Sequence, residues 1–427
     1  MMSKDWIDRD VARVWHGFTQ MATYADNEPV IVERAEGHYL IGTDGRRYLD
    51  AISSLWVTTL GHRVPELDAA LIEQLGRVAH STLLGNGSKV VIEFAEALGE
   101  VVPIPDPHFM FASDGAAAVE QALKIAFQYW TNQGVRGRTS YLAFGGAYHG
   151  DTVGSLSLGA DGFGSAIFDP LRFPVLRAPG FDASDCMAIA ADMIRTDSER
   201  LAAVVVEPYV QGAAGVKIHD PAGFKVLQQA CDETGVLLIC DEVATGFGRT
   251  GTMFASQRCE LTPDIMTLGK GITGGYLPMS VTVSNRKVHD AFLGEDLSEK
   301  TLYHGHSYGG NALAAAIALR HLRLLSEWSV LDNVAKRSAQ LQQLLSEKVS
   351  LLSIVRDVRV AGLMCGVELE EKHKRGRRVC ATAVRSGVLL RPLGDVIVIV
   401  PLLTSTEEEI ETIVDVLADA ISQEEGH

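Results

Sequence analysis

The sequence has few of the features that mark metal-binding, membrane or nucleic-acid-binding proteins. Its six cysteines are scattered singly, with no Cys-x-x-Cys pair and no His/Cys cluster at zinc spacing. No stretch approaches the roughly 20 apolar residues that a membrane span requires, and residues 1–10 are polar where a secretory signal needs an apolar run. The formal net charge of -16 disfavours nucleic-acid and anionic-membrane partners, which attract basic surfaces. We therefore expect a cytoplasmic protein with reduced thiols and no metal site.

What is present indicates a soluble α/β protein of more than one domain. The chain has 427 residues, of which 47% are hydrophobic and 22% charged, and this length favours a large domain with a smaller one attached. From residue 61 to residue 325 short apolar strands alternate with helices, a pattern typical of a mainly parallel sheet between helices. The best strand candidates are Phe109–Ala112, Ser140–Phe144, Ala203–Glu207 and Val236–Cys240, with shorter ones at Ile265–Leu268 and Met279–Val283.

The two ends of the chain have a different character. Residues 1–60 carry a hairpin signal at Asp44-Gly45, and we assign this segment to the small domain. Residues 326–427 predict a compact α+β domain, with an amphipathic helix to about Val349, strand-like segments at 363–369, 388–391 and 396–400, and a final helix after Thr404.

The strongest chemical signal is an acid followed by a lysine. Asp241 ends a buried strand, where open α/β sheets place their ligands, and Lys270 follows the next strand candidate. In pyridoxal 5'-phosphate (PLP) chemistry, such an acid pairs with the pyridine nitrogen, and such a lysine forms a Schiff base and moves protons. Taken singly, Asp241 could cap a turn and Lys270 could be an exposed turn lysine. Together they favour a PLP site.

Three further segments fit such a site. Ser113–Ala117 joins a strand to a helix through small residues and predicts a phosphate cup, with Asp114 capping the helix. The segment His304–Ser307 is a second candidate for phosphate donors, and its His-x-His spacing does not indicate zinc. In Tyr148–Asp151 the aromatic ring could stack on a flat heterocycle, and Asp151 could meet a cationic group.

The residues that carry these signals resemble those of class III PLP-dependent aminotransferases, over essentially the whole chain. The resemblance lies in Asp241–Gly251, in the glycine-rich segment around Lys270, and in Glu207–Gly212. Within that family, several segments resemble the 7,8-diaminopelargonic acid branch of biotin synthesis, namely Trp15–Met21, Ser53–Trp56, Ala126–Trp130, Tyr148–Thr152 and Arg391–Asp395, with Ala244 as a further match.

The resemblance implies fold type I and a role for each matching residue. Lys270, Asp241 and Tyr148 would be the catalytic residues. The cofactor would be held by Gly115, Ala116, Tyr148, Glu207, Asp241, Val243, Lys270 and a neighbouring subunit's Ser307, which implies a homodimer with shared active sites. The substrate pocket would comprise Phe18, Trp56, Tyr148, Asp151, Lys270, Gly305 and Arg391, with Arg391 taking the substrate carboxylate.

The implied reaction converts 8-amino-7-oxononanoate to 7,8-diaminononanoate. Gly17 and Phe18 depart from the Pro and Tyr common in the branch, and Leu55 replaces the first of a Trp-Trp pair. Together with the segments Ala79–Gly85 and His304–Tyr308, these changes resemble the Bacillus-type branch, whose amino donor is lysine. The donor implied is therefore either lysine or S-adenosylmethionine. The alternatives are another ω-aminotransferase of the diamine, 4-aminobutyrate or ornithine type, and a non-catalytic PLP-binding protein. A kinase or nucleotide-dependent ligase is disfavoured because the chain has no GxxxxGK[ST] loop.

Overall fold

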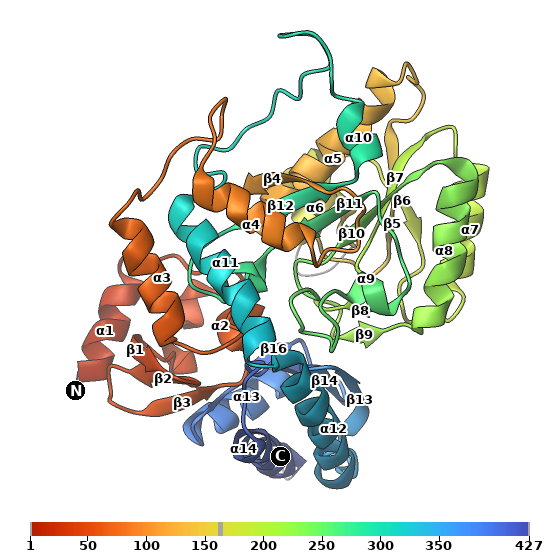
Figure 1. The fold of residues 1–427 in the computed structure, drawn as a ribbon. Coiled ribbons are helices and arrows are strands. Elements are labelled where there is room, and N and C mark those ends of the chain that lie inside the picture. The colour runs from red at the N-terminus through yellow and green to blue at the C-terminus, as the bar shows by residue number, and fades with distance from the viewer. Residues whose placement is uncertain (1, 161–164, 426–427) are drawn as a thin grey trace. The chain divides into compact units, whose positions relative to one another are not determined.

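The computed structural model of the protein describes residues 2–160 and 165–425. The chain divides into two compact units. The terminal unit combines the segment up to Pro65 with the segment from Lys336, and the middle unit comprises Glu66–Ala335. The red-to-blue colouring of Figure 1 distinguishes the two chain ends, which form the terminal unit, from the middle of the chain.

A seven-stranded sheet forms the centre of the middle unit. Its strands are β4 (His108–Ala112), β5 (Ser140–Phe144), β6 (Leu176–Ala178), β7 (Leu201–Val206), β10 (Leu237–Asp241), β11 (Ile265–Leu268) and β12 (Ser280–Ser284), in the order β4-β12-β11-β10-β7-β5-β6. β10 pairs parallel with β11 and β7, and β5 pairs parallel with β7 and β6. β12 pairs antiparallel with β11 and β4. The sheet is therefore mainly parallel, as the sequence predicts, with one strand reversed.

Helix α5 (Gly115–Asn132) packs against five strands of this sheet, β4, β7, β10, β11 and β12. Its buried residues include Val119, Ala122, Ala126 and Trp130, which share one face at helical spacing. Asp114 caps its first turn, since the carboxylate Oδ1 accepts a hydrogen bond from the Ala117 N–H at 2.9 Å. This cap confirms the expected role of Asp114.

The other helices of the middle unit lie around the sheet (Figure 1). α7 and α8 pack against each other, as do α4 and α11. The bounds are α3 (Pro65–Leu75), α4 (Lys89–Gly99), α6 (Val153–Leu158), η3 (Ser165–Leu171), α7 (Cys186–Thr196), η4 (Pro221–Gly223), α8 (Phe224–Thr234), α9 (Ala255–Arg258), η5 (Lys270–Thr273), α10 (Arg286–Asp290) and α11 (Ala312–Glu327), with a small ribbon of β8 (Val210–Gln211) and β9 (Lys217–Ile218).

The terminal unit contains two four-stranded sheets. One has the order β1-β2-β3-β15, from β1 (Val32–Glu36), β2 (Tyr39–Gly42), β3 (Arg47–Asp50) and β15 (Val388–Leu389). The other has the order β13-β14-β17-β16, from β13 (Val355–Ala361), β14 (Met364–Leu369), β16 (Arg391–Leu393) and β17 (Val396–Ile399). Because β15 pairs parallel with β3, both chain ends contribute to one sheet. The helices are α1 (Met2–Val11), η1 (Met21–Thr23), η2 (Ala25–Asn27), α2 (Ser53–Trp56), α12 (Val330–Lys348), α13 (Arg375–Arg385) and α14 (Glu407–Glu425).

The local expectations are met in most places. The hairpin at Asp44-Gly45 joins β2 to β3, and Gly45 adopts the positive φ of +80° that favours glycine there. The single strand expected at 388–391 is wrong, because β15 pairs with β3 whereas β16 pairs with β17. Strand β13 is not predicted from the sequence, and the structure shows that it is only partly buried.

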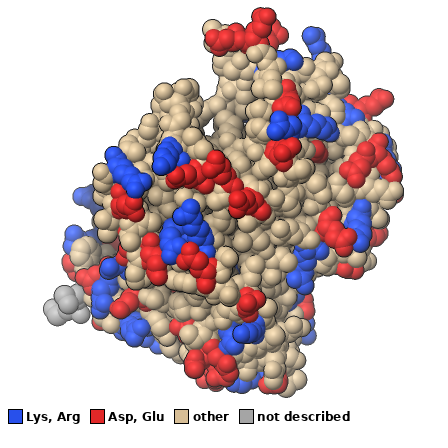
Figure 2. All heavy atoms as spheres, viewed as in Figure 1, with Lys and Arg blue, Asp and Glu red and all other residues tan. Residues whose placement is uncertain are grey.

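Along the described part of the chain, no helix is both long and apolar enough to cross a membrane. The six cysteines are free thiols and all are buried. On the face shown in Figure 2, acidic and basic side chains are interspersed.

Candidate active site

Asp241 is the last residue of β10 and its carboxylate is buried within a set of donors. Oδ1 accepts hydrogen bonds from the Val243 N–H at 3.1 Å and from the Thr267 hydroxyl at 3.0 Å. Oδ2 lies 2.6 Å from Nδ1 of His149. Since β10 and β11 run parallel, Thr267 reaches Asp241 directly across the ladder, where the two residues are register partners. Strand pairing and side-chain bonds together fix this carboxylate at the edge of the sheet.

His149 holds the other side of this carboxylate and is fully buried at its side chain. Burial lowers the pKa of the imidazole, but the hydrogen bond to Asp241 and the charges of Asp241 and Glu207 outweigh it, so the pKa of His149 is raised. Its Nε2 atom is buried and has no hydrogen-bond partner within the described residues. The contact therefore fixes the Asp241 carboxylate and leaves a polar ring atom of His149 available beside it.

Glu207 adds a second buried acid to the same region. It directly follows β7, and its two oxygens accept hydrogen bonds from the N–H groups of Tyr148 at 3.1 Å and Gly212 at 3.2 Å. Burial raises the pKa of Glu207 to about 7, although the nearby His149 lowers it in part. This acid holds the backbone of Tyr148, whose phenol donates to Asp151 Oδ2 at 2.8 Å.

Lys270 is the first residue of η5, directly beyond β11 and Gly269. Burial lowers the pKa of its amine, and the charges of Asp241 and Glu207 oppose that shift in part. Its backbone adopts φ +44°, a strained conformation for a residue with a side chain. A buried amine with a lowered pKa, near two acids, is a nucleophile suited to carbonyl chemistry.

Gly115, Val243 and Gly269 meet where the ends of three strands converge. A Cβ atom added at Gly115 would lie 2.6 Å from Cγ1 of Val243, and one at Gly269 would lie 3.3 Å from the same atom. Only glycine therefore fits at position 115 without a shift of Val243. The N–H groups of Gly115 and Ala116 belong to the first turn of α5, where backbone donors have no acceptor within the helix. This turn has the form of a phosphate site.

Glu242, the neighbour of Asp241, has a different role. Its oxygens accept hydrogen bonds from the Thr245 hydroxyl at 2.5 Å and from the N–H groups of Ala255 at 3.0 Å and Ser256 at 2.6 Å. It thus fastens the loop after β10 to the start of α9. Of these two adjacent acids, Glu242 stabilises the loop, and Asp241 is the candidate for the chemistry.

The remaining candidate residues have other neighbours or belong to the other unit. His80 Nε2 lies 2.8 Å from the carbonyl oxygen of Ser307, and a Cβ atom at Gly305 would meet the side chain of Leu84. Phe18, Trp56 and Arg391 belong to the terminal unit. Their roles stay predictions.

The contact between His149 and Asp241 is not predicted by the sequence. The two residues are separated by 92 positions in the chain. No local pattern indicates which distant carboxylate a loop histidine will meet. Among the described residues no group of three His, Cys, Asp or Glu side chains could hold a metal ion.

We expect the cofactor-free protein to lose stability as pH rises from about 5 to about 8. The folded-state pKa values of Glu207 and His149 are both raised. The two groups therefore contribute their full stabilisation of the folded state below their ordinary pKa values. This contribution is lost as pH rises through their pKa values in the folded protein. Since the pKa of Glu207 is about 7 against an ordinary 4.5, its contribution to the change is roughly 3 kcal/mol.

Urea unfolding of the cofactor-free protein across this pH range measures the effect. Glu207→Gln should flatten the decline, because the amide does not titrate. An equally steep decline in Glu207→Gln would show that other groups cause it.

The chain is similar to known proteins over nearly its whole length. Residues 20–421 match the family described as aminotransferase class-III. The chain is 44% identical to the adenosylmethionine-8-amino-7-oxononanoate aminotransferase of Nitratidesulfovibrio vulgaris, over 96% of this chain and 80% of that protein. A crystal structure of the enzyme with that name from Methanocaldococcus jannaschii is 37% identical, with a TM-score of 0.94 over 99% of each chain.

An amine transaminase from an uncultivated Pseudomonas species, in a PLP-bound form, matches at 32% identity and a TM-score of 0.88, over 96% of this chain and 98% of that one. The fold type and the enzyme class expected from the sequence are confirmed. The chain therefore belongs to the class-III aminotransferases, a family of PLP-dependent transaminases.

Proposed function

We propose that this aminotransferase converts 8-amino-7-oxononanoate to 7,8-diaminononanoate, a step of biotin synthesis. The observation that carries the proposal is the 44% identity, over 96% of the chain, to a relative named for this acceptor. Lys270, with the pKa of its amine lowered by burial, and the buried pair of Asp241 and His149 support the amino-transfer chemistry. The relative's name also gives adenosylmethionine, one of the two donors that fit the proposal.

The residues of the middle unit fit PLP, and we propose this unit as the cofactor-binding domain. When bound, PLP supplies a carbonyl that condenses with amines and a pyridine ring that takes up electrons from the substrate carbon. The first turn of α5, with Gly115 and Ala116, would bind the phosphate. Asp241, which His149 contacts at 2.6 Å, would hold the proton on the pyridine nitrogen, and Tyr148 and Val243 would lie against the two ring faces.

Lys270 would attach the cofactor and then move a proton. The pKa of its amine is lowered by burial, so a neutral form is available to accept a proton from the substrate carbon and return it. Asp241 and Glu207 lie close enough to influence that pKa. The chain thus supplies a base at one end of the ring and an acid partner at the other.

The acceptor carries an amine near the reacting ketone and a carboxylate at its far end. We propose that Tyr148 and Asp151 receive the amine, since their side chains are hydrogen-bonded to each other at 2.8 Å and an acid suits a cation. Phe18 and Trp56 would line the aliphatic chain, and Arg391 would bind the carboxylate. Gly305 would leave room in the same pocket.

A homodimer with shared active sites also forms part of the proposal. Ser307 would reach the phosphate bound by the neighbouring subunit. Several large apolar side chains in the segments around it are exposed, including Leu84 at 62%, Leu297 at 78%, Tyr303 at 67% and Tyr308 at 62%. Exposed apolar side chains on neighbouring loops favour a protein partner.

The test compares two acceptors at equal concentration. Purified protein loaded with PLP should aminate 8-amino-7-oxononanoate with a far higher kcat/KM than succinic semialdehyde. The reverse ratio would favour the alternative, an ω-aminotransferase of the 4-aminobutyrate type, which the same lysine and acid would serve. Stopped-flow mixing with lysine or with S-adenosylmethionine then identifies the donor from the loss of the carbonyl form of the cofactor.

A further inference from the structure

A groove of about 650 Å³ crosses the terminal unit between the segment after α1 and helix α13. Its apolar walls include Phe18, Ile52 and Val384, while Lys374, Arg377 and Arg391 supply positive charge. The groove is therefore shaped for a ligand with an aliphatic part and an anionic part. Asp26 and Glu28 also line it, as do Arg378 and Arg385, so cations are in excess.

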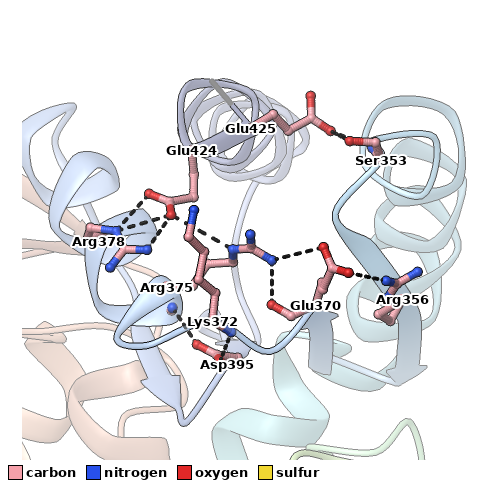
Figure 3. Close-up of polar contacts among 10 residues, drawn as sticks. Ser353, Arg356, Glu370, Lys372, Arg375, Arg378, Asp395, Glu424 and Glu425 are labelled. Carbon is pink, nitrogen blue, oxygen red and sulfur yellow. Dashed lines mark hydrogen bonds and ion pairs between the residues drawn. The ribbon is translucent and has the colours of Figure 1, made fainter. Parts of the chain in front are cut away.

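The cations at the start of α13 divide into those that have an acidic partner and those that have none. Arg375 and Arg378 both form ion pairs with Glu424 of α14, as Figure 3 shows, and Arg375 also pairs with Glu370. Lys374 and Arg377 have no acidic partner within the described residues, and both side chains are exposed. Arg375 and Arg378 thus serve the fold, whereas Lys374 and Arg377 leave their charges available to a ligand.

Close packing holds the start of α13 against the strand that carries Arg391, and Lys374, Arg377 and Arg391 all line the groove. A Cβ atom at Gly376 would clash with the carbonyl oxygen of Gly394 and lie 3.1 Å from Cβ of Pro392. Asp395 reinforces the contact, because its carboxylate accepts hydrogen bonds from the N–H groups of Gly376 at 2.9 Å and Lys372 at 3.0 Å (Figure 3). The lack of a side chain at Gly376 therefore allows α13 to reach the strand that carries Arg391.

Three residues that line the groove hold left-handed backbone conformations without being glycine. Phe18 has φ +53°, Glu28 has φ +50° and Lys374 has φ +58°. Such strained conformations gather where a ligand is held. Lys374 directly precedes the first turn of α13, and it lines the groove.

We propose that Lys374 and Arg377 are specificity-determining residues that, together with Arg391, form a three-cation site for a carboxylate at the end of an aliphatic chain. The inference rests on the proposed function for the identity of that carboxylate, which is the one of 8-amino-7-oxononanoate. The inference extends the proposed function, because Lys374 and Arg377 would bind the carboxylate together with Arg391. Acceptors with a terminal carboxylate are selected over neutral ones of the same length.

Binding of octanoate to the PLP-loaded protein, measured by titration calorimetry, tests the site. Removing one of three partly exposed cations should weaken binding about threefold to tenfold in Arg377→Gln and in Lys374→Gln. Neutral octanamide should bind equally to both variants and to the unmodified protein. Raised salt should weaken octanoate binding less in the variants, because fewer charges remain to be screened.

Lys372→Gln is the matched control, since it removes the same charge from the same segment at a residue that does not line the groove. It should bind octanoate as the unmodified protein does. Unchanged octanoate binding in Arg377→Gln and Lys374→Gln, or an equal loss for octanamide, would overturn the inference. Octanoate binding that depends on Arg377, in a protein that does not aminate 8-amino-7-oxononanoate, would support the carboxylate site and refute the proposed function.

Discussion

Replacing Lys270 by alanine is expected to abolish transamination and covalent attachment of the cofactor. The amine is buried, its pKa is lowered by burial, and it lies near both Asp241 and Glu207. Loss of proton transfer alone costs about 10²–10⁴-fold in rate, and loss of the nucleophile adds to that. Because the cofactor is no longer attached covalently, the protein should also retain less PLP.

Borohydride reduction followed by mass spectrometry provides a readout that is independent of activity. The unmodified protein should carry one pyridoxyl group on the peptide that contains Lys270, and Lys270→Ala should carry none. Lys270→Arg keeps a cation there but cannot form the imine, so it should be equally inactive. Lys225→Ala, which removes an exposed lysine paired with Glu260, is the control and should behave as the unmodified protein does. A labelled peptide in Lys270→Ala would refute the assignment.

The positions of Asp241 and Lys270 could be predicted because each depends on local sequence. A run of apolar residues that ends in an acid indicates a buried strand with its acid at the carboxyl edge, and β10 ends at Asp241 as expected. The same reasoning places Lys270 beyond β11. The Asp114 cap and the start of α5 follow from capping preferences, which act within three residues.

Features that depend on long-range packing could not be predicted. The contact between His149 and Asp241, and the approach of Glu207 to Tyr148, join segments 92 and 59 positions apart. Burial of a strand gives no information on its direction, so the reversal of β12 between β4 and β11 left no signal in its apolar pattern. The two strands on either side of Leu390 read as one because they are adjacent in sequence, although they join different sheets.

Asp241→Asn is expected to lower kcat about 10²–10⁴-fold while preserving the fold. The amide has the same shape, and its oxygen can still accept from the Val243 N–H and the Thr267 hydroxyl. It carries no charge, so it cannot keep the proton on the cofactor's pyridine nitrogen. The pKa of His149 should also fall, because the hydrogen bond to Asp241 and its charge are what raise it. Thr267→Val removes one of the donors to Asp241 and should have a much smaller effect on kcat.

A double-mutant cycle with His149→Asn separates a positioning role from a general effect on packing. We expect His149 to affect the reaction through its 2.6 Å contact with Asp241. Its replacement should therefore lower kcat and PLP affinity when Asp241 is present. In the Asp241→Asn background the same replacement should change neither, because the charge that His149 orients is already gone. Equal losses in both backgrounds would mean that His149 contributes packing alone, since a structural defect does not depend on the charge at position 241. The cycle therefore measures how much of the acid's effect depends on a histidine 92 residues away.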